Sequence, residues 1–280
     1  MYHKLLILAT AILALFSGPV ESQIPPSPPA LSYADLADLA VAAPIAAHVR
    51  VKDADMLRAE EAPTVPAGHR RFLIEAEIVA LIRGQGGIEG PVTYVVDLAN
   101  DSRGRPARIE RRAEYLIMAQ RVPERPGMLR LAAPDAQIPY APATADRLRA
   151  ILREATAAGA APRITGIGRA FHVPGSLPGE SETQIFLQTA DNRPISLSIL
   201  RRPGERPSWS VALSEIVDNA AAAPARDTLL WYRLACTLPR RLPAVSFREA
   251  SGAEAAAIAA DYSLVLQGLG PCQRTRRLRS

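Results

Sequence analysis

The feature that most constrains this chain is the alternation of apolar and polar residues in RFLIEAEIVALIRG, residues 71–84. A period of two places successive side chains on opposite faces, which is typical of a half-buried β-strand. One face would carry Phe72, Ile74, Ala76, Ile78, Ala80 and Ile82, and the other would carry Glu75 and Glu77. Two carboxylates at alternate positions of a strand indicate a solvated face rather than an acid–base pair. The pattern therefore predicts one long strand without a catalytic role.

The glycine-rich stretch that follows, residues 84–90, raises the question of a phosphate site. A phosphate-binding loop needs glycines that lead into the N-terminus of a helix, with Lys and Ser or Thr behind them. Here the next segment is PVTYVVDL, which alternates again, and Glu89 would repel an anion. The glycines therefore predict a connection between two strands.

The rest of the first half predicts further strands between two helices. Ser32 and Asp35 fit a capping box that opens a short helix, with Asp in place of the usual Glu. IAAHVRVKDADML, EYLIMAQRV and GMLRLAAP are three more candidate strands, and Thr144 can cap a second helix that ends by Gly159. Strands without regular β-α-β alternation favour a small barrel or sandwich over residues 32–158.

Five segments of the chain together carry a resemblance to a known family. These segments are YADLADLA, AAHVRVKDA, ALIRG, TYVVDL and EYLIMA. Together they resemble the netrin/TIMP-like OB-fold domains of secreted proteins, over residues 32–135. The resemblance implies an OB-like small β-barrel with flanking helices and a binding role. Ala113 stands where the family has a glycine, and this half contains no cysteine. Metalloprotease inhibition, which depends on an N-terminal cysteine in that family, is therefore not implied.

Residues 160–272 predict a smaller antiparallel β-unit with a C-terminal helix. TQIFLQT, PISLSILRR and SWSVALSEIV are short candidate strands separated by turn-forming residues, and PRITGIGRAFHVPGSLPGESE is a glycine pair followed by a turn-rich loop. TLLWYRLACTLP alternates like another strand, and Ser251 with Glu254 forms a capping box that opens an alanine-rich helix. The fold class expected for the chain is α+β and mostly β.

The only two cysteines, Cys236 and Cys272, both lie in this second half. Export would favour a disulfide between them, which would hold the C-terminal helix against the TLLWYRLACTLP strand. Two buried free thiols are the alternative. Two cysteines without a Cys-x-x-Cys motif exclude a thiolate zinc site and a thioredoxin-like redox motif.

The first residues predict export. Residues 1–22 combine a basic start, an apolar run and small residues before a cleavage point, as in a secretory signal peptide. The run falls short of the roughly 20 apolar residues that span a bilayer, and no later segment reaches that length. An uncleaved anchor is the alternative. A proline-rich lead-in over residues 23–31 would follow, and the mature protein would be periplasmic or secreted.

The net charge of +5 does not indicate nucleic-acid binding. Basic and acidic residues balance at 17 each between residues 23 and 159, so the excess lies in the second half and in a basic tail, residues 273–280. The tail arginines are Arg274, Arg276, Arg277 and Arg279. A short basic tail is typically solvated and frayed, with weak contact to an anionic surface as the functional alternative. No recognition helix or basic strand interleaved with aromatic residues occurs.

No catalytic or metal-binding motif stands out. His48, His69 and His172 lie in separate segments without a metal-ligand spacing, so we expect neither metal nor cofactor. The candidate binding surface consists of Arg201, Arg202, Arg206 and Trp209, because Arg and Trp are enriched at binding hot spots. Hairpin-tip arginines and a core tryptophan are the alternative reading of those four residues.

We therefore expect a non-enzymatic exported protein of the bacterial envelope that binds an envelope protein or polymer. The alternative is an exported hydrolase that acts on envelope polymers or proteins, with its site between the two domains. That alternative requires His172 or His69 to meet a Ser and an Asp, or Glu180 or Glu182 to face another carboxylate.

Overall fold

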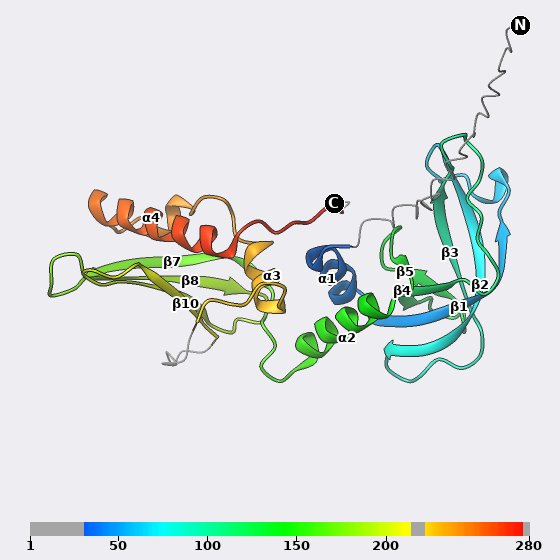
Figure 1. The fold of residues 1–280 in the computed structure, drawn as a ribbon, viewed down its shortest axis with the longest axis horizontal. Helices are drawn as coiled ribbons and strands as arrows, with labels where there is room; N and C mark the ends of the chain where they lie inside the picture. Colours follow the sequence, from blue (N-terminus) through cyan, green and yellow to red (C-terminus); the bar gives the residue numbers. More distant parts are fainter. Residues whose placement is uncertain (1–30, 214–221, 277–280) are drawn as a thin grey trace, which may run out of the picture. The chain divides into compact units, whose positions relative to one another are not determined.

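The computed structural model describes residues 31–213 and 222–276, which form two antiparallel sheets and four α-helices (Figure 1). The predicted class, α+β and mostly β, is confirmed. The predicted signal peptide and almost all of the proline-rich lead-in lie outside the described residues, as do Arg277 and Arg279 of the tail. No helix of the described part combines the length and the apolar character needed to cross a membrane.

The first sheet is built from residues before 140. Its strands run in the order β3-β2-β1-β4-β5, and β6 also pairs with β4. The elements are α1 (Tyr33–Ala42), β1 (Ile45–Met56), a 3₁₀ turn η1 (Ala59–Glu61), β2 (His69–Arg83), β3 (Val92–Ala99), β4 (Glu114–Arg121), β5 (Leu129–Leu131), β6 (Gln137–Pro139) and α2 (Pro142–Thr156).

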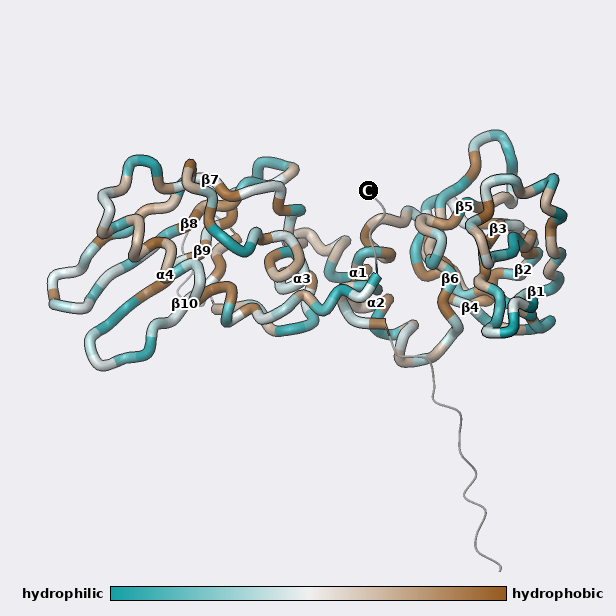
Figure 2. The backbone as a smooth tube through the Cα atoms, turned by 90° about the horizontal axis from the view of Figure 1, so that it is seen from above, coloured by the Kyte–Doolittle hydropathy of each residue, from teal (hydrophilic) through white to brown (hydrophobic). Residues whose placement is uncertain are grey.

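The second sheet follows α2 and has the strand order β10-β9-β8-β7. The remaining elements are β7 (Ile164–Pro174), β8 (Ser181–Thr189), β9 (Ile195–Arg201), β10 (Ser208–Ala212), α3 (Leu229–Ala235), a 3₁₀ turn η2 (Ala244–Phe247) and α4 (Gly252–Leu269). Hydrophobic stretches occur in the strands of both sheets and in the helices, and several strand-connecting loops are hydrophilic (Figure 2).

The long alternating segment forms β2, the longest strand described, which pairs with β1 on one side and β3 on the other. Phe72, Ile74 and Ala76 are buried in the core of this sheet, as the alternation predicts. Near the end of β2 the predicted face is wrong, because Leu81 packs against this core and Ile82 packs against the other one. The glycines after β2 form the predicted strand connection, because the chain continues directly into β3. Gly86 and Gly87 adopt φ of 74° and 62°, a backbone region that glycine enters at no steric cost.

The strands of the first sheet curl without closing into a barrel. The edges β3 and β5 approach at one parallel bridge, between Thr93 and Met128, where the Thr93 N–H donates to the Gly127 carbonyl at 2.8 Å. Inside the curl lies an apolar core that includes Val49, Ile74 and Tyr94. The closed form of the predicted barrel is therefore absent from the described residues.

Three local predictions were wrong. TLLWYRLACTLP is helix α3, in which Thr228 caps the N–H of Trp231, because a short apolar run fits either period. PRITGIGRAFHV is strand β7 rather than a glycine-led loop. Gly166 and Gly168 lie at register shifts of β7, where bulges commonly carry glycine. Helix α2 begins at Pro142, two residues before the predicted cap Thr144, because proline suits the first helical turn.

The disulfide joins Cys236 to Cys272, with the Cα atoms 5.0 Å apart. Cys236 is the C-terminal cap of α3, and Cys272 follows the end of α4. The bond therefore ties the segment after α4 to a helix, not to the expected strand. The capping box of Ser251 and Glu254 at the start of α4 is present in both directions, as predicted.

Candidate functional site

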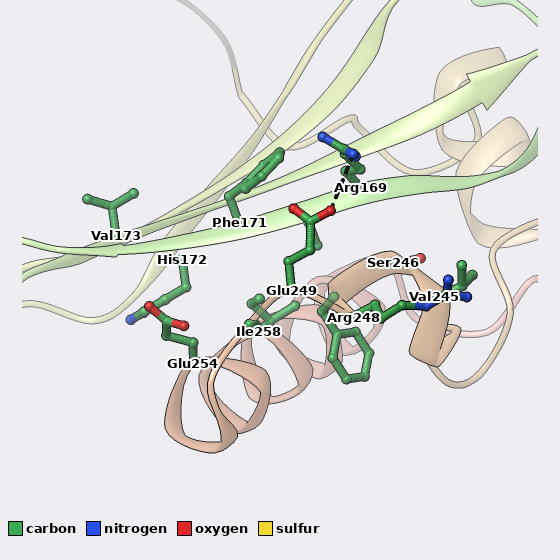
Figure 3. Close-up of a pocket in the computed structure, with 13 residues that line it drawn as sticks. Arg169, Phe171, His172, Val173, Val245, Ser246, Arg248, Glu249, Glu254 and Ile258 are labelled. Carbon is green, nitrogen blue, oxygen red and sulfur yellow. Dashed lines mark hydrogen bonds and ion pairs between the residues drawn. The ribbon is translucent and has the colours of Figure 1, made fainter.

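A groove of about 300 Å³ lies along β7 (Figure 3). One wall consists of five consecutive β7 residues, 169–173. The other wall consists of residues 245–250, which include most of η2, together with Glu254 and Ile258 of α4. Successive side chains of a strand point to opposite faces, so a groove that contacts five in a row runs along the edge of the strand.

This edge of β7 has no strand partner among the described residues, since β7 pairs with β8 alone. The Gly175 N–H donates to the Glu180 carbonyl at 2.8 Å, and the register then continues without a shift back to Ala170. Hydrogen-bonded and non-bonded pairs alternate along an antiparallel ladder. The backbone groups of Phe171 therefore face β8, and those of Ala170 and His172 face the groove.

The rim of the groove is apolar and solvent-accessible. Val173, Phe171 and Val245 are 62%, 44% and 60% exposed. Phe171 and Val173 point away from α4, whereas His172 points toward it, beside Glu254 (Figure 3). Phe171 packs edge-to-face on Phe186 of β8, with ring centroids 6.1 Å apart. Large apolar side chains gathered at an exposed rim are a common mark of an interaction site.

A chain of buried polar groups fixes α4 to the sheet beneath this groove. Asp261 of α4 is 1% exposed, and its carboxylate accepts hydrogen bonds from Thr183 of β8 and from Arg201 Nε of β9, the latter at 2.8 Å. The Thr183 hydroxyl gives its single hydrogen to Asp261, so it accepts from His172 Nδ1 at 2.8 Å. Because a buried carboxylate is costly unless it is paired, the bonds of Asp261 fix the helix to β8 and β9, and His172 of β7 is linked to them through Thr183.

The hydrogen bonds among His172, Thr183 and Asp261 do not fit the predicted hydrolase triad. His172 does meet a hydroxyl and an aspartate, but Thr183 is fully buried and its proton is directed at Asp261, away from any substrate. Ser246 lines the same groove, yet its buried hydroxyl has no hydrogen-bond partner in the described structure. His69 bonds only to the carbonyl of Ala67 in its own loop.

The two glutamates singled out from the sequence are also engaged locally. Glu180 accepts hydrogen bonds from the N–H groups of Ser176 and Leu177, and Glu182 accepts one from Gln184. Within residues 31–213 and 222–276, no group of three His, Cys, Asp or Glu side chains is placed to hold a metal ion.

The four residues of the predicted binding surface do not share one surface. Arg201 turns inward to Asp261, and the indole of Trp209 packs on Gly268 so closely that an added Cβ would lie 2.5 Å from Nε1. Arg202 lies 4.0 Å from Glu205 at the β9–β10 hairpin, and Arg206 is exposed there. Their roles in the fold differ, because two support the packing of α4 and two belong to a solvated turn.

A second polar cluster lies in the first sheet. His48 Nε2 is 2.8 Å from Glu114, and the guanidinium of Arg50 bonds to both Glu114 and Glu77. The hydrogen bond from Arg50 and the contact with His48 lower the pKa of Glu114. Tyr140 stacks on the His48 ring at 3.8 Å. These contacts link β1, β2 and β4.

The basic tail is partly anchored, which corrects the expectation of a frayed end. The guanidinium of Arg274 forms two hydrogen bonds with Asp38, and that of Arg276 forms two with Asp135. The backbone N–H groups of Thr275 and Arg276 donate to the buried carboxylate of Asp35. Burial alone would raise the pKa of Asp35, but the hydrogen bond from the Thr275 hydroxyl, together with these backbone bonds, outweighs it and lowers that pKa. Residues 274–276 therefore form a C-terminal strap on α1.

The residues that build the groove were missed from the sequence because β7 was interpreted as a loop. The stretch ITGIGRAFHV is rich in β-branched and aromatic residues, and that signal could have identified a strand. Asp261 was also missed, although it is a single acid within the apolar stretch AAAIAADYSLVL. Such a residue is either solvated or specifically paired.

Comparison of the chain with models of protein families and with curated proteins finds no match.

Proposed function

We propose that this chain is an exported, non-enzymatic binding protein that holds an extended polypeptide segment against the edge of β7. The observation that carries the proposal is the groove lined by five consecutive β7 residues, with outward backbone groups at Ala170 and His172. Exposed strand edges pair readily with an added strand. Peptide binding by strand addition takes its affinity from such main-chain bonds and its specificity from neighbouring pockets.

The dimensions of the groove support a single peptide strand. Five β7 residues at about 3.3 Å each extend over roughly 16 Å, which is the length of a five-residue extended segment. Side chains on one face of that segment would lie on Ala250, and those on the other face would lie beside Phe171 and Val173. The groove thus offers an apolar contact on both faces of the ligand.

The hydrolase alternative finds no support in this geometry, because the hydroxyl beside His172 is buried and committed to Asp261. Two further features support the other parts of the prediction. The disulfide fits an oxidising compartment, as export to the periplasm or beyond would require. The curled first sheet, with its bridge between β3 and β5, supports an OB-like module, since OB-folds are five-stranded, partly open barrels.

A selection from random octapeptides displayed on phage tests the proposed function. The oxidised protein should enrich a family of peptides, and replacing alternate backbone N–H groups of an enriched peptide by N-methyl groups should weaken binding at least tenfold. Ala170→Pro removes one groove-facing N–H at an edge position that tolerates proline, and it should weaken binding similarly. Val173→Asp places a charge on the apolar rim and should do the same.

Met56→Asp is the matched control, because Met56 is 51% exposed and belongs to the first sheet. It should bind enriched peptides as the unmodified protein does, and thermal unfolding should show that all variants are folded. Enriched peptides that bind Ala170→Pro and Val173→Asp with undiminished affinity would overturn the β7 site. Failure of the unmodified protein to enrich any peptide would overturn peptide binding itself.

A further inference from the structure

The charged residues that line the groove balance each other. Arg169 and Glu249 pair at 3.4 Å across the β7 edge (Figure 3). Glu254 accepts the N–H of Ser251 in the capping box, and this hydrogen bond lowers the pKa of the Glu254 carboxyl. The exposed Arg248 completes a lining of two arginines and two glutamates. Selection among ligands therefore depends on apolar contacts rather than on net charge.

The face of the second sheet that points away from α4 is apolar next to the groove. Phe171 and Val173 lie on this face (Figure 3). In the register of the sheet Val173 is opposite Glu182 and Glu182 is opposite Leu200, so Leu200 shares the face, and Phe186 contacts Phe171 edge-to-face. These four apolar side chains are all exposed. Large apolar residues gathered on a solvated sheet face indicate an interaction surface.

A strand added at the β7 edge would extend this apolar face by one strand. Residues directly opposite each other on paired strands share a face, with Cβ atoms about 5 Å apart. Ligand residues opposite Phe171 and Val173 would therefore lie on the apolar face, and the residue opposite His172 would point toward α4 and Ala250. Aromatic and β-branched side chains form favourable pairs across strands. The two faces of the ligand thus meet different surroundings.

We propose that the groove selects an extended segment with large apolar side chains at every second residue, placed beside Phe171 and Val173. The proposal rests on the proposed function and adds the sequence pattern of the ligand. In this arrangement the groove-facing backbone of Ala170 and His172 binds any extended segment, and the two apolar side chains determine specificity.

A second copy of this chain is a poorer occupant of the groove. Antiparallel pairing of two β7 strands requires a twofold axis perpendicular to the joined sheet. Such an axis would place both η2 segments on the same face, each of them against the β7 strand of the other copy. A single peptide strand brings no wall of its own.

Two labelled peptides of identical composition test the proposal by fluorescence anisotropy: Ser-Val-Thr-Phe-Thr-Val-Ser and Ser-Thr-Val-Phe-Val-Thr-Ser. The first places its three apolar side chains on one face of a strand, and the second divides them between both faces. The first should bind about fivefold or more tightly than the second.

Three variants locate the origin of this preference, and thermal unfolding should show that each is folded. Phe171→Ser should reduce the preference to less than about twofold, because it removes the cross-strand contact and keeps the backbone. Val79→Ser, which changes an exposed valine of β2, is the matched control and should keep the preference. Leu200→Ser should also keep it, because β9 is separated from the β7 edge by β8.

Each outcome assigns the result to one proposal. Equal affinity for the two peptides, still weakened by Ala170→Pro, would overturn the sequence pattern and leave the groove as the binding site. A preference that neither Ala170→Pro nor Phe171→Ser changes would mean binding elsewhere and overturn both proposals. Equal loss in Leu200→Ser and Phe171→Ser would place the peptide across the sheet face and overturn binding at the edge. A dimer in sedimentation that Phe171→Ser dissociates would assign the groove to a second copy and overturn the proposed ligand pattern.

Discussion

The two sheets differ in whether their edge strands meet. The first sheet curls until its edge strands meet at Thr93 and Met128, so its unpaired backbone is largely turned on itself. The second sheet stays open, and β7 presents groove-facing backbone beside η2 and α4. The first sheet therefore encloses an apolar interior, whereas the second leaves the backbone of one edge strand accessible. Binding is therefore expected of the second.

The largest effect is expected at Asp261, a buried carboxylate of α4 that accepts hydrogen bonds from Thr183 of β8 and Arg201 of β9 and lies 3.9 Å from His172 of β7. Asp261→Ala leaves Arg201 and Thr183 without their acceptor and should lower the free energy of unfolding by about 3–5 kcal/mol. Urea denaturation measures the loss, and hydrogen exchange should place it in β7–β9. Asp146→Ala, at an exposed ion pair, should cost less than about 1 kcal/mol. Similar losses for both variants would contradict this assignment.

The disulfide is the next largest difference between the two halves. It closes a loop with a sequence separation of 36, for which chain entropy gives roughly 4 kcal/mol, and engineered cases often give less. Replacing both Cys236 and Cys272 by Ser should lower stability by about 2–4 kcal/mol. Adding reductant should destabilise the unmodified protein and leave the double variant unchanged. A reductant effect of equal size in both would exclude the disulfide as its cause.

The C-terminal strap should make the stability of the protein depend on pH. Hydrogen bonds from the strap hold the folded-state pKa of Asp35 below its unfolded value near 3.8. The stabilisation is therefore complete above that value and is lost as pH falls through the folded-state pKa. Between pH 5 and pH 2.5, the unmodified protein should lose more stability in urea denaturation than Asp35→Asn does. Asp53→Asn, which changes an exposed carboxyl, should follow the unmodified protein. Parallel losses in all three proteins would refute this role of Asp35.

The smallest effect on stability is expected at Val173, where the proposed effect on peptide binding is large. Val173 is 62% exposed at the rim, so Val173→Asp should change the free energy of unfolding by less than about 0.5 kcal/mol. Thermal and urea unfolding check this, and they also show that lost peptide binding comes from the rim. A loss above 2 kcal/mol would mean that Val173 supports the fold rather than the ligand.

Long patterns with matching local signals could be predicted from the sequence. The alternation in β2 and the capping box of α4 each carry several consistent residues, so local preference and final structure agree. The strand β7 and the helix α3 could not be assigned in this way. In β7 the bulges at Gly166 and Gly168 interrupt the period of two, and in α3 the apolar run is too short to distinguish the two periods.

The candidate site was harder to predict than the fold, because its parts come from distant segments. Thr183 and Asp261 are separated by 78 residues, and their bond depends on how α4 lies on the sheet. The groove is defined by an absence of pairing at β7 and by the position of η2, and neither is written in a local pattern. The disulfide pair was the exception, since two cysteines allow only one pairing.

The strap makes completion of the fold depend on the last part of the chain. Asp35 is fully buried near the start of the described residues, and the groups that satisfy its carboxylate belong to Thr275 and Arg276. During synthesis or vectorial export from the N-terminus, α1 therefore emerges about 240 residues before its partners, by the separation of Asp35 and Thr275. Until then the carboxylate lacks these donors, so burying it as α1 packs would cost free energy that the C-terminal residues later offset. A chain that ends before residue 274 would still contain the residues of both sheets, but its Asp35 carboxylate would be buried without the hydrogen-bond donors of Thr275 and Arg276.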